Sequence, residues 1–344
     1  MKYSYNNKEV FPRVEVYHDI IPYMADVKMK DFFMDKQKCV YAWKTSTAKL
    51  KEYYGDMFPM RKPAPAPISY GHLMSIGATV LFPDDGEPNI LPFAESIDEA
   101  IEILKKIKGA DMTKTRWFQH YFEMWEYMKA KFPNENIPFS GFGSQGPVTS
   151  AILMRGQDFL LDIYDEPEKS LEFLSLITDS SIDFVKLTRR INNQPEVQPH
   201  AGMVDDHASL IPPDMWNKFV IPFWEQRFNA LYTGTSRSVH VENLYPAHLS
   251  YLKEAKVTHY QPSVSDFITL EIIKDKLDPS ISIDWLLYAY HITDMSDEEI
   301  QEWVDKTVEW GVSEVRTQFG AYAYQIGKLD RIKAFMKAFD KYKI

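Results

Sequence analysis

Histidine and carboxylate side chains recur near the ends of short apolar runs that the sequence predicts as strands. One such run covers 237–242 and ends in His240-Val241-Glu242. Because alternate residues of a strand project to the same face, His240 and Glu242 would lie on one side of it. An imidazole and a carboxylate in this arrangement can supply two of the ligands of a zinc ion.

A zinc site with these two ligands needs a third one, which another strand must supply. We expect His259, in the predicted strand over 257–261, to be that ligand. The alternatives, each near the end of another predicted strand, are Asp206, Asp284 and Gln318. A buried hydrogen bond between His240 and Glu242, with no metal, is the competing interpretation.

Two adjacent acidic residues and a histidine follow the predicted strand over 199–205. Asp206 and His207 are the candidates for a general acid or base, or for contact with the substrate. Adjacent residues of a strand face opposite ways, so only one of Asp205 and Asp206 can reach a site. The alternative is that Asp206 begins a turn and that His207 packs against the next helix.

The candidate substrate contacts are mostly aromatic. They are Tyr70, Phe142, Tyr260, Trp285 and the amide side chain of Gln318. Together these rings could form a wall around a planar ligand. For each aromatic residue taken alone, packing in the core is the alternative interpretation.

The elements that must position these side chains alternate along the chain. Predicted strands cover 76–82, 136–142, 199–205, 237–242, 257–261, 280–285 and 312–318, with segments of helical periodicity between them. This order predicts an α/β fold, a (β/α)₈ TIM-type barrel over 70–344, with a helical and loop extension over 1–69 packed on it. A doubly wound open sheet is the alternative. In a barrel the site lies at the carboxyl ends of the strands, where the candidates fall.

Composition excludes several classes of function. The chain has 344 residues, with 39 Lys and Arg against 49 Asp and Glu, and a formal net charge of −10. This charge argues against a nucleic acid or an anionic membrane as partner. Cys39 is the single cysteine, which excludes an internal disulfide and a cysteine-rich zinc motif. The N-terminal residues lack the apolar segment of a signal peptide, so we expect a cytoplasmic protein, and a homodimer is compatible with the sequence.

Three stretches resemble a known superfamily. They are YGHLMSIGATVLFPDDGEPN (70–89), GPVTSAILMRGQDFLLDIYDEPEKSLEFL (146–174) and the Asp205-Asp206 pair followed by IPPDMWNKFVIPFWEQ (211–226). In order and spacing they resemble the uroporphyrinogen decarboxylase superfamily, which also contains the corrinoid- and zinc-dependent methyltransferases. With the later strands, the resemblance covers about 70–335.

The resemblance separates two branches. Porphyrinogen decarboxylases have an arginine-rich segment that binds substrate carboxylates, and the comparable region here, 40–56, has no arginine. The methyltransferases have a His-x-Cys pair on a barrel strand and a later cysteine, which together bind zinc. His240 occupies the histidine position, Glu242 replaces the first cysteine, and 318–320 offers no thiol.

The resemblance therefore implies a methyltransferase with an altered metal centre. We expect Zn²⁺ on His240, Glu242 and His259 to polarise the oxygen of a small methoxylated, aromatic substrate. The methyl group would pass to the cobalt of a corrinoid carried by a partner protein, and Asp206 or His207 would orient or protonate the leaving oxygen. A metal-free decarboxylase-like enzyme acting on a small carboxylate and a non-catalytic barrel that docks a corrinoid protein are the alternatives.

Overall fold

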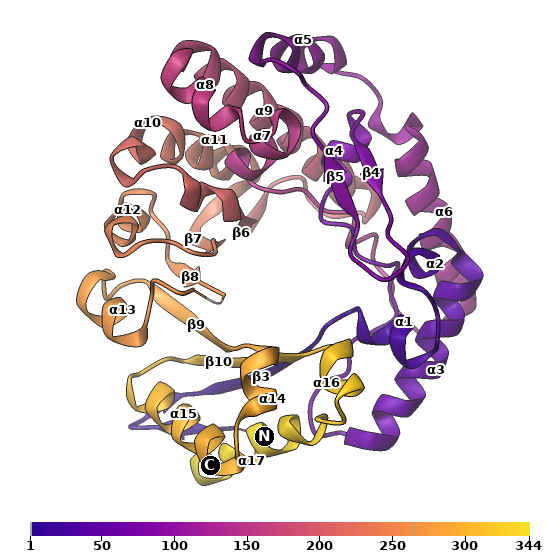
Figure 1. Cartoon of the computed structure of the whole chain (residues 1–344), viewed down its shortest axis with the longest axis vertical. Helices are drawn as coiled ribbons and strands as arrows, with labels where there is room; N and C mark the ends of the chain where they lie inside the picture. The colour runs from indigo at the N-terminus through magenta and orange to yellow at the C-terminus, as the bar shows by residue number, and fades with distance from the viewer. Residues whose placement is uncertain (1, 264) are drawn as a thin grey trace.

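The computed structural model describes residues 2–263 and 265–344. Six parallel strands form its central sheet in the order β3-β10-β9-β8-β7-β6. Their bounds are β3 Phe11–Val16, β6 Gln198–Val204, β7 Tyr232–His240, β8 His259–Gln261, β9 Ser282–Leu287 and β10 Glu314–Phe319. The strands and their helices run round a ring (Figure 1).

Two further segments continue the ring between β3 and β6, the two ends of the sheet. Ile68 and Phe142 form a parallel bridge between these segments. Beyond Phe142, the backbone N–H of Gly146 donates to the carbonyl of Val204 at the end of β6 (2.6 Å). On the other side, Arg61 donates to the carbonyl of Val16 at the end of β3 (3.2 Å). The predicted TIM-type α/β architecture is confirmed, with two of its strand positions reduced to a single bridge.

Helices surround the ring. The α-helices are α1 Ile20–Met24, α2 Met29–Met34, α3 Lys36–Tyr54, α4 Gly71–Ser75, α5 Ile97–Ile107, α6 Arg116–Lys131, α7 Pro147–Arg155, α8 Phe159–Asp165, α9 Pro167–Ile191, α10 Trp216–Phe219, α11 Ile221–Leu231, α12 Leu249–Glu254, α13 Leu270–Lys276, α14 Ala289–Asp294, α15 Asp297–Glu309, α16 Ala321–Gln325 and α17 Asp330–Ala338. The 3₁₀ turns are η1 Met112–Lys114, η2 Asp206–Leu210, η3 Pro213–Met215, η4 Pro246–His248 and η5 Asp340–Tyr342. Among the described residues, no helix is long and apolar enough to cross a membrane.

Two parts of the sequence take other positions than expected. The predicted strand over 76–82 shortens to β4 (Thr79–Leu81), which pairs with β5 (Asn89–Leu91) in an antiparallel hairpin outside the central sheet. The segment Phe11–Val16 lies in the predicted extension over 1–69, yet it is a strand of the sheet. Its charged residues and Pro12 hide the apolar alternation by which a strand is recognised. The division of the chain at residue 69 remains a prediction.

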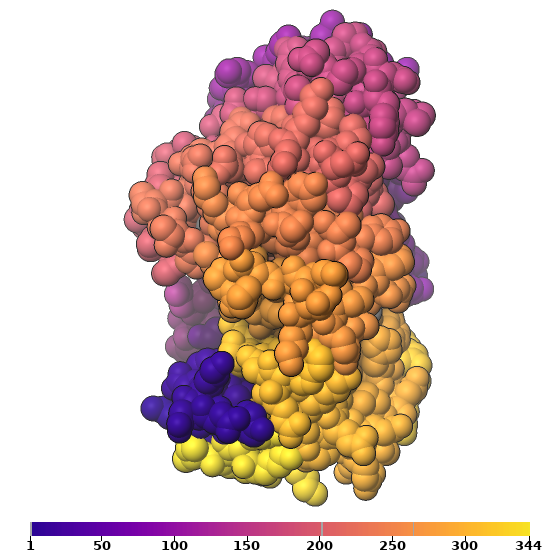
Figure 2. All heavy atoms as spheres, turned by 90° about the vertical axis from the view of Figure 1, so that its left-hand side faces the viewer, coloured from indigo at the N-terminus to yellow at the C-terminus, as the bar shows by residue number. Residues whose placement is uncertain are grey.

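The two chain ends meet on the outside of the ring. Tyr3 forms an antiparallel bridge with Lys343, and the backbone N–H of Ile344 donates to the carbonyl of Lys2 (3.2 Å). Figure 2 shows the N-terminal residues, in indigo, against the C-terminal residues, in yellow. The N-terminal segment is thereby held against the C-terminal one, and β3, which follows it, pairs with β10.

Each strand presents one face to the helices and one to the interior of the ring. Val239 and Tyr260 are buried in the apolar layer under the helices, as is Val315. The residues that alternate with them face inward and include His240 and Asp284. On β3 and β7–β10 most residues in register on this inward face are charged or polar, and Phe11 and Leu286 are the apolar ones: the polar set is Arg13, Glu15, Ser238, His240, His259, Gln261, Ser282, Asp284, Glu314, Arg316 and Gln318. TIM-type barrels usually fill this space with branched aliphatic residues, so a polar interior indicates a functional lumen.

His72 of α4 predicts a stability that depends on pH. Its side chain is fully buried, with Nε2 2.9 Å from the Ser180 hydroxyl, and burial together with the charge of Arg227 lowers its pKa to about 3. In the unfolded chain a histidine takes up a proton near pH 6.5. The folded state is therefore fully stabilised above about pH 6.5 and loses roughly 1.4 kcal/mol per pH unit as the pH falls toward 3.

Urea unfolding between pH 4 and 8 measures this dependence. We expect His72→Gln to flatten the pH dependence below pH 6.5, and His291→Gln, at an exposed histidine, to leave it as in the wild type. An unchanged pH dependence in His72→Gln would show that other groups cause the loss.

Candidate functional site

The candidate site lies at the carboxyl ends of three neighbouring strands. His240 is the last residue of β7 and is in register with Gln261, the last residue of β8. Asp206 follows β6 and begins η2, and Glu242 follows β7 by two residues. The structure therefore brings His240, Glu242 and Asp206 together at the end of the ring where barrels hold their sites.

Two carboxylates converge on one nitrogen of His240. Its Nε2 lies 3.3 Å from Asp206 Oδ1 and 3.6 Å from Glu242 Oε1. Its Nδ1 contacts the side-chain oxygen of Gln261. Because that oxygen only accepts hydrogen bonds, Nδ1 carries a proton and Nε2 is left facing the two carboxylates. A proton shared between these side chains, or a metal ion, would satisfy the contact between Nε2 and the two carboxylates.

Burial and charge perturb both carboxylates. The pKa of Asp206 is raised to about 6, chiefly by burial; the charge of His240 acts against this rise, and the charge of Glu242 adds to it. The pKa of Glu242 is lowered, chiefly by its hydrogen bond with His240. The backbone N–H of Glu242 also donates to Asp206 Oδ1 (3.3 Å), which holds the two acidic residues next to each other. Such strongly perturbed groups at a barrel mouth are typical of a functional site.

Asp205 holds the base of the site in place. It is fully buried, and its carboxylate accepts hydrogen bonds from Trp224 Nε1 (2.7 Å) and from the backbone N–H groups of Thr149 (2.7 Å) and Val148 (3.4 Å). It thereby caps the first turn of α7. Gly146 leaves room for this contact, since a Cβ there would come within 2.3 Å of the Asp205 side chain.

His259, expected as the third metal ligand, does not reach His240. The register pairs His259 with Ser238, two residues before His240, so His259 lies one layer deeper in the lumen. It groups instead with Asp284 and Glu314. The carboxylate of Asp206, one of the alternatives, lies beside His240 Nε2. His207 follows Asp206 half-buried, with a pKa lowered by burial, and its Nδ1 has no hydrogen-bond partner among the described residues.

The predicted substrate contacts divide into two groups. Tyr260 is 0% exposed under the helices, with its hydroxyl donating to the Val241 carbonyl, and Phe142 is 3% exposed and stacked on Tyr121. Trp285 packs into the same apolar layers. These three rings face the helices, because the alternation that turns their neighbours inward turns them outward. Gln318 faces the lumen. Tyr70 is half-buried, and burial raises its pKa; the negative charge of nearby Asp206 raises it to a smaller extent.

Sequence reasoning missed several residues of the mouth. Tyr17 and Asp19 follow β3, and Tyr288 follows β9. Burial is the main cause of a raised pKa of Tyr288, and the negative charge of Glu242 contributes to it. Glu87, in the β4–β5 turn, contacts His18 through its carboxylate (2.8 Å). The same search of strand ends would have found Tyr17 and Asp19 if 11–16 had been recognised as a strand.

A large cavity lies away from this site. It has a volume of about 1120 Å³ and is lined by the start of β3, from Phe11 to Arg13, and by residues 55–63. We assign the candidate site from the convergence of side chains on His240 and not from cavity size.

Comparisons with known proteins agree with this architecture. The sequence profile described as "Uroporphyrinogen decarboxylase (URO-D)" matches residues 69–275. Among 22 matching solved chains is a "methyltransferase from Methanosarcina mazei", with a TM-score of 0.66 and 13% identity, covering 98% of this chain and 95% of that one. No curated protein matches the sequence significantly. The profile spans more than half of the chain, and the chain therefore belongs to the uroporphyrinogen decarboxylase (URO-D) family.

Proposed function

We propose that this protein is a methyltransferase that removes the methyl group of a small methoxylated, aromatic substrate and passes it to the cobalt of a corrinoid on a partner protein. Zn²⁺ would be held by His240, Asp206 and Glu242. The observation that carries the proposal is the convergence of two carboxylates on Nε2 of His240 at the barrel mouth. The fold likeness to a methyltransferase over nearly the whole chain supports it.

The residue types at the mouth suit a zinc ion, although among the described residues it is the ligand atoms of His259, Asp284 and Glu314 that all lie within 4.8 Å of one another. One imidazole nitrogen and two carboxylate oxygens form a donor set that catalytic zinc uses, and Gln261 fixes the imidazole through its other nitrogen. With Asp206 as the third ligand in place of His259, two carboxylates balance the charge of Zn²⁺, so the site is neutral overall. A zinc site with two thiolates and one histidine is neutral as well, so net charge does not distinguish the two kinds of site. Carboxylates are harder ligands than thiolates and favour an oxygen-bound substrate. When bound, the ion would supply Lewis acidity toward the ether oxygen.

The chain's own residues would bind and orient the substrate. Tyr70 and Tyr288 lie near the two carboxylates, Tyr70 near Asp206 and Tyr288 near Glu242, and their rings can contact an aromatic substrate. His207 follows Asp206 directly and has a depressed pKa, so it is neutral near pH 7. A neutral imidazole can donate a hydrogen bond but has no acidic proton to transfer, so His207 is our candidate for the group that orients the leaving oxygen.

The rim of the mouth suits a protein partner. Exposed apolar side chains follow several strands at their carboxyl ends: Leu210, Tyr245, Phe267, Tyr290 and Tyr322. Exposed aromatic residues are enriched at protein interfaces. A corrinoid carrier that docks there would place its cofactor over the lumen.

The charge of the mouth disfavours a polycarboxylate substrate. Asp19 and Glu87 lie on one side of the lumen, and Asp206 and Glu242 lie on the other. Four acidic side chains would repel an anionic substrate unless they are neutralised. This favours a neutral ether over the small carboxylate that a decarboxylase-like enzyme would take.

A reconstituted assay tests the proposed function. The zinc-loaded protein is mixed with reduced free cobalamin, as a surrogate acceptor, and a panel of methoxyarenes. We expect formation of the free phenol, measured by chromatography, together with a change in the corrinoid absorption spectrum, and we expect both to be lost after chelation. A folded protein with about one zinc per chain at the mouth that demethylates no compound would contradict the proposal. A protein that binds no metal there would favour the decarboxylase-like alternative.

A further inference from the structure

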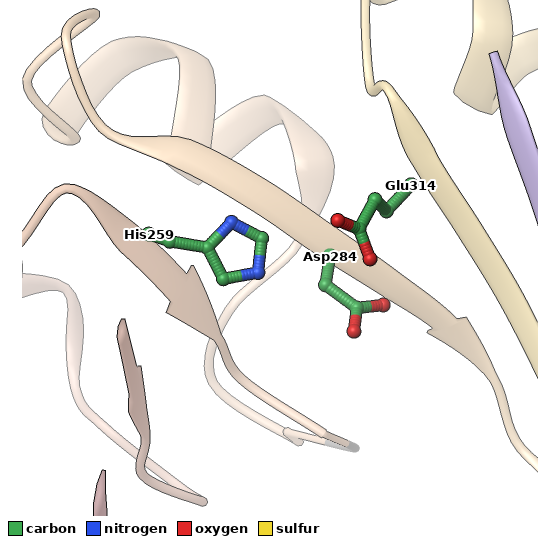
Figure 3. A group of neighbouring side chains, drawn as sticks. All are labelled: His259, Asp284 and Glu314. Atoms are coloured by element: carbon green, nitrogen blue, oxygen red, sulfur yellow. The ribbon is translucent and has the colours of Figure 1, made fainter. Parts of the chain in front are cut away.

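A second group of side chains converges deeper in the lumen. His259, Asp284 and Glu314 come from β8, β9 and β10, and they offer ligand atoms that lie within 4.8 Å of one another. Figure 3 shows the three side chains extending into the same space, with the His259 ring directed toward Asp284. The group lies near the amino ends of these strands, at the opposite end of the ring from the His240 site.

Hydrogen bonding leaves Nε2 of His259 free to bind a cation. Its Nδ1 lies 2.9 Å from the Ser282 hydroxyl, and that hydroxyl donates its own proton to the carbonyl of Thr258 (3.1 Å). The Ser282 oxygen therefore accepts from His259, and the proton of the ring sits on Nδ1. Nε2 is left with a lone pair, as in histidines that bind metals and are oriented through their other nitrogen.

Asp284 is buried with one oxygen unsatisfied. Its side chain is 5% exposed, and Oδ2 lies 3.1 Å from Nη2 of Arg316. Its Oδ1 has no hydrogen-bond partner among the described residues. An unpaired buried carboxylate oxygen is costly, and a bound cation would satisfy it.

Glu314 is oriented by an arginine in the same manner. Its Oε2 accepts a hydrogen bond from Nη1 of Arg13 (2.8 Å). Each carboxylate of the group thus contacts its arginine through one oxygen, and the arginines neutralise part of the charge that the pair would otherwise concentrate in the lumen. They act as supports that fix the carboxylates in place.

A polar cavity connects the group to solvent. It has a volume of about 580 Å³ and is lined by His259 and Glu314 together with His200 and several serine and threonine residues. Hydroxyl and imidazole groups can accompany a hydrated ion on its way in. The group therefore has an entry path as well as ligands.

We propose that His259, Asp284 and Glu314 form a second metal site, which binds a divalent first-row transition ion such as Zn²⁺ or Co²⁺. One imidazole and two carboxylates suit these ions, whereas Ca²⁺ and Mg²⁺ prefer oxygen ligands alone. The ion connects three neighbouring strands at the end of the barrel opposite the mouth. It stabilises the sheet, and the site does not depend on the proposed methyl transfer.

Cobalt binding tests the site. Chelator-treated full-length protein is dialysed against micromolar Co²⁺, and bound cobalt is counted per chain by mass spectrometry. We expect His259→Gln and Asp284→Asn each to bind one ion fewer than the wild type. His200→Gln is the matched control, since His200 lines the same cavity outside the group, and it should bind as the wild type does. At saturating metal the unfolding midpoint of the wild type should rise by about 4 °C, and that of His259→Gln should rise less.

The result that would overturn the proposal is equal cobalt binding in the wild type and in His259→Gln. If Asp284→Asn fails to fold without its pair to Arg316, His259→Gln decides alone, because His259 has no ionic partner to lose among the described ion pairs. His240→Ala separates the two sites. Loss of one ion in that variant concerns the mouth, and loss in His259→Gln concerns the second site, so either proposal can fail while the other stands.

Discussion

Replacing His240 with alanine is expected to lower the rate of methyl transfer by about a thousand-fold or more, with the fold intact. His240 is the residue on which Asp206 and Glu242 converge, and without it the two carboxylates have no shared partner. The metal count at the mouth should fall with the rate. The measurements are kcat/KM for demethylation and zinc per chain.

Three further variants provide comparisons for this result. His200→Gln changes a histidine on the adjacent strand β6, away from the mouth, and should retain the wild-type rate. Gln261→Ala should cost about 10- to 100-fold, because Gln261 positions His240 without contacting substrate. Gln261→Glu keeps an acceptor for His240 Nδ1 and should restore part of the rate. A His240→Ala enzyme within a few-fold of the wild type would make His240 a packing residue.

Replacing Asp205 with alanine is expected to lower the free energy of unfolding by about 3–5 kcal/mol. The variant leaves the indole N–H of Trp224 and the amide N–H of Thr149 buried without an acceptor and removes the cap of α7. Urea unfolding of the purified variant measures the loss. The same variant should also lose activity, because Asp205 sets the position from which Asp206 reaches His240.

Controls separate the buried carboxylate from a general effect of charge. Asp214→Ala removes an exposed carboxylate nearby and should change stability by less than about 0.5 kcal/mol. Gly146→Ala places a methyl group against Asp205 and should destabilise, whereas Gly202→Ala meets no atom within 4 Å and should not. If Asp205→Ala and Asp214→Ala unfold at the same urea concentration, the buried network does not stabilise the fold.

Local patterns in the sequence predicted most of the elements. Ser96 and Ser296 cap helices α5 and α15 as their spacing with Glu99 and Glu299 indicates. Pro167 favours the first position of a helix, and α9 begins there and ends at Ile191. Pro212 and Pro213 also favour a helix start, but the segment that follows is divided at Val220, with η3 and α10 before it and α11 after it. Capping and periodicity act within a few residues, which is why they can be recognised without the fold.

Rings that we expected around the substrate lie in the core, because the type of a residue does not determine which side of a strand its side chain is on. Tyr260 and Trp285 lie at strand positions next to inward-facing residues, and they pack under the helices. Tyr17 and Tyr288, on loops after strands, lie at the mouth instead. An aromatic ring is equally compatible with a core and with a ligand pocket, so only the assembled layers distinguish the two.

The sequence by itself determined the alternating α/β order and that His240 and Glu242 share a face, because a strand has a period of two. The tertiary structure determines which residues of different strands lie in the same layer of the lumen. The parallel register places His240 beside Gln261 and leaves His259 two residues lower, with Asp284 and Glu314. A shift of two residues keeps every side chain on its face but moves it by about 6.6 Å, beyond the reach of a shared ion. Register between strands distant along the chain is set by how the helices and sheet pack together, and no local spacing encodes it.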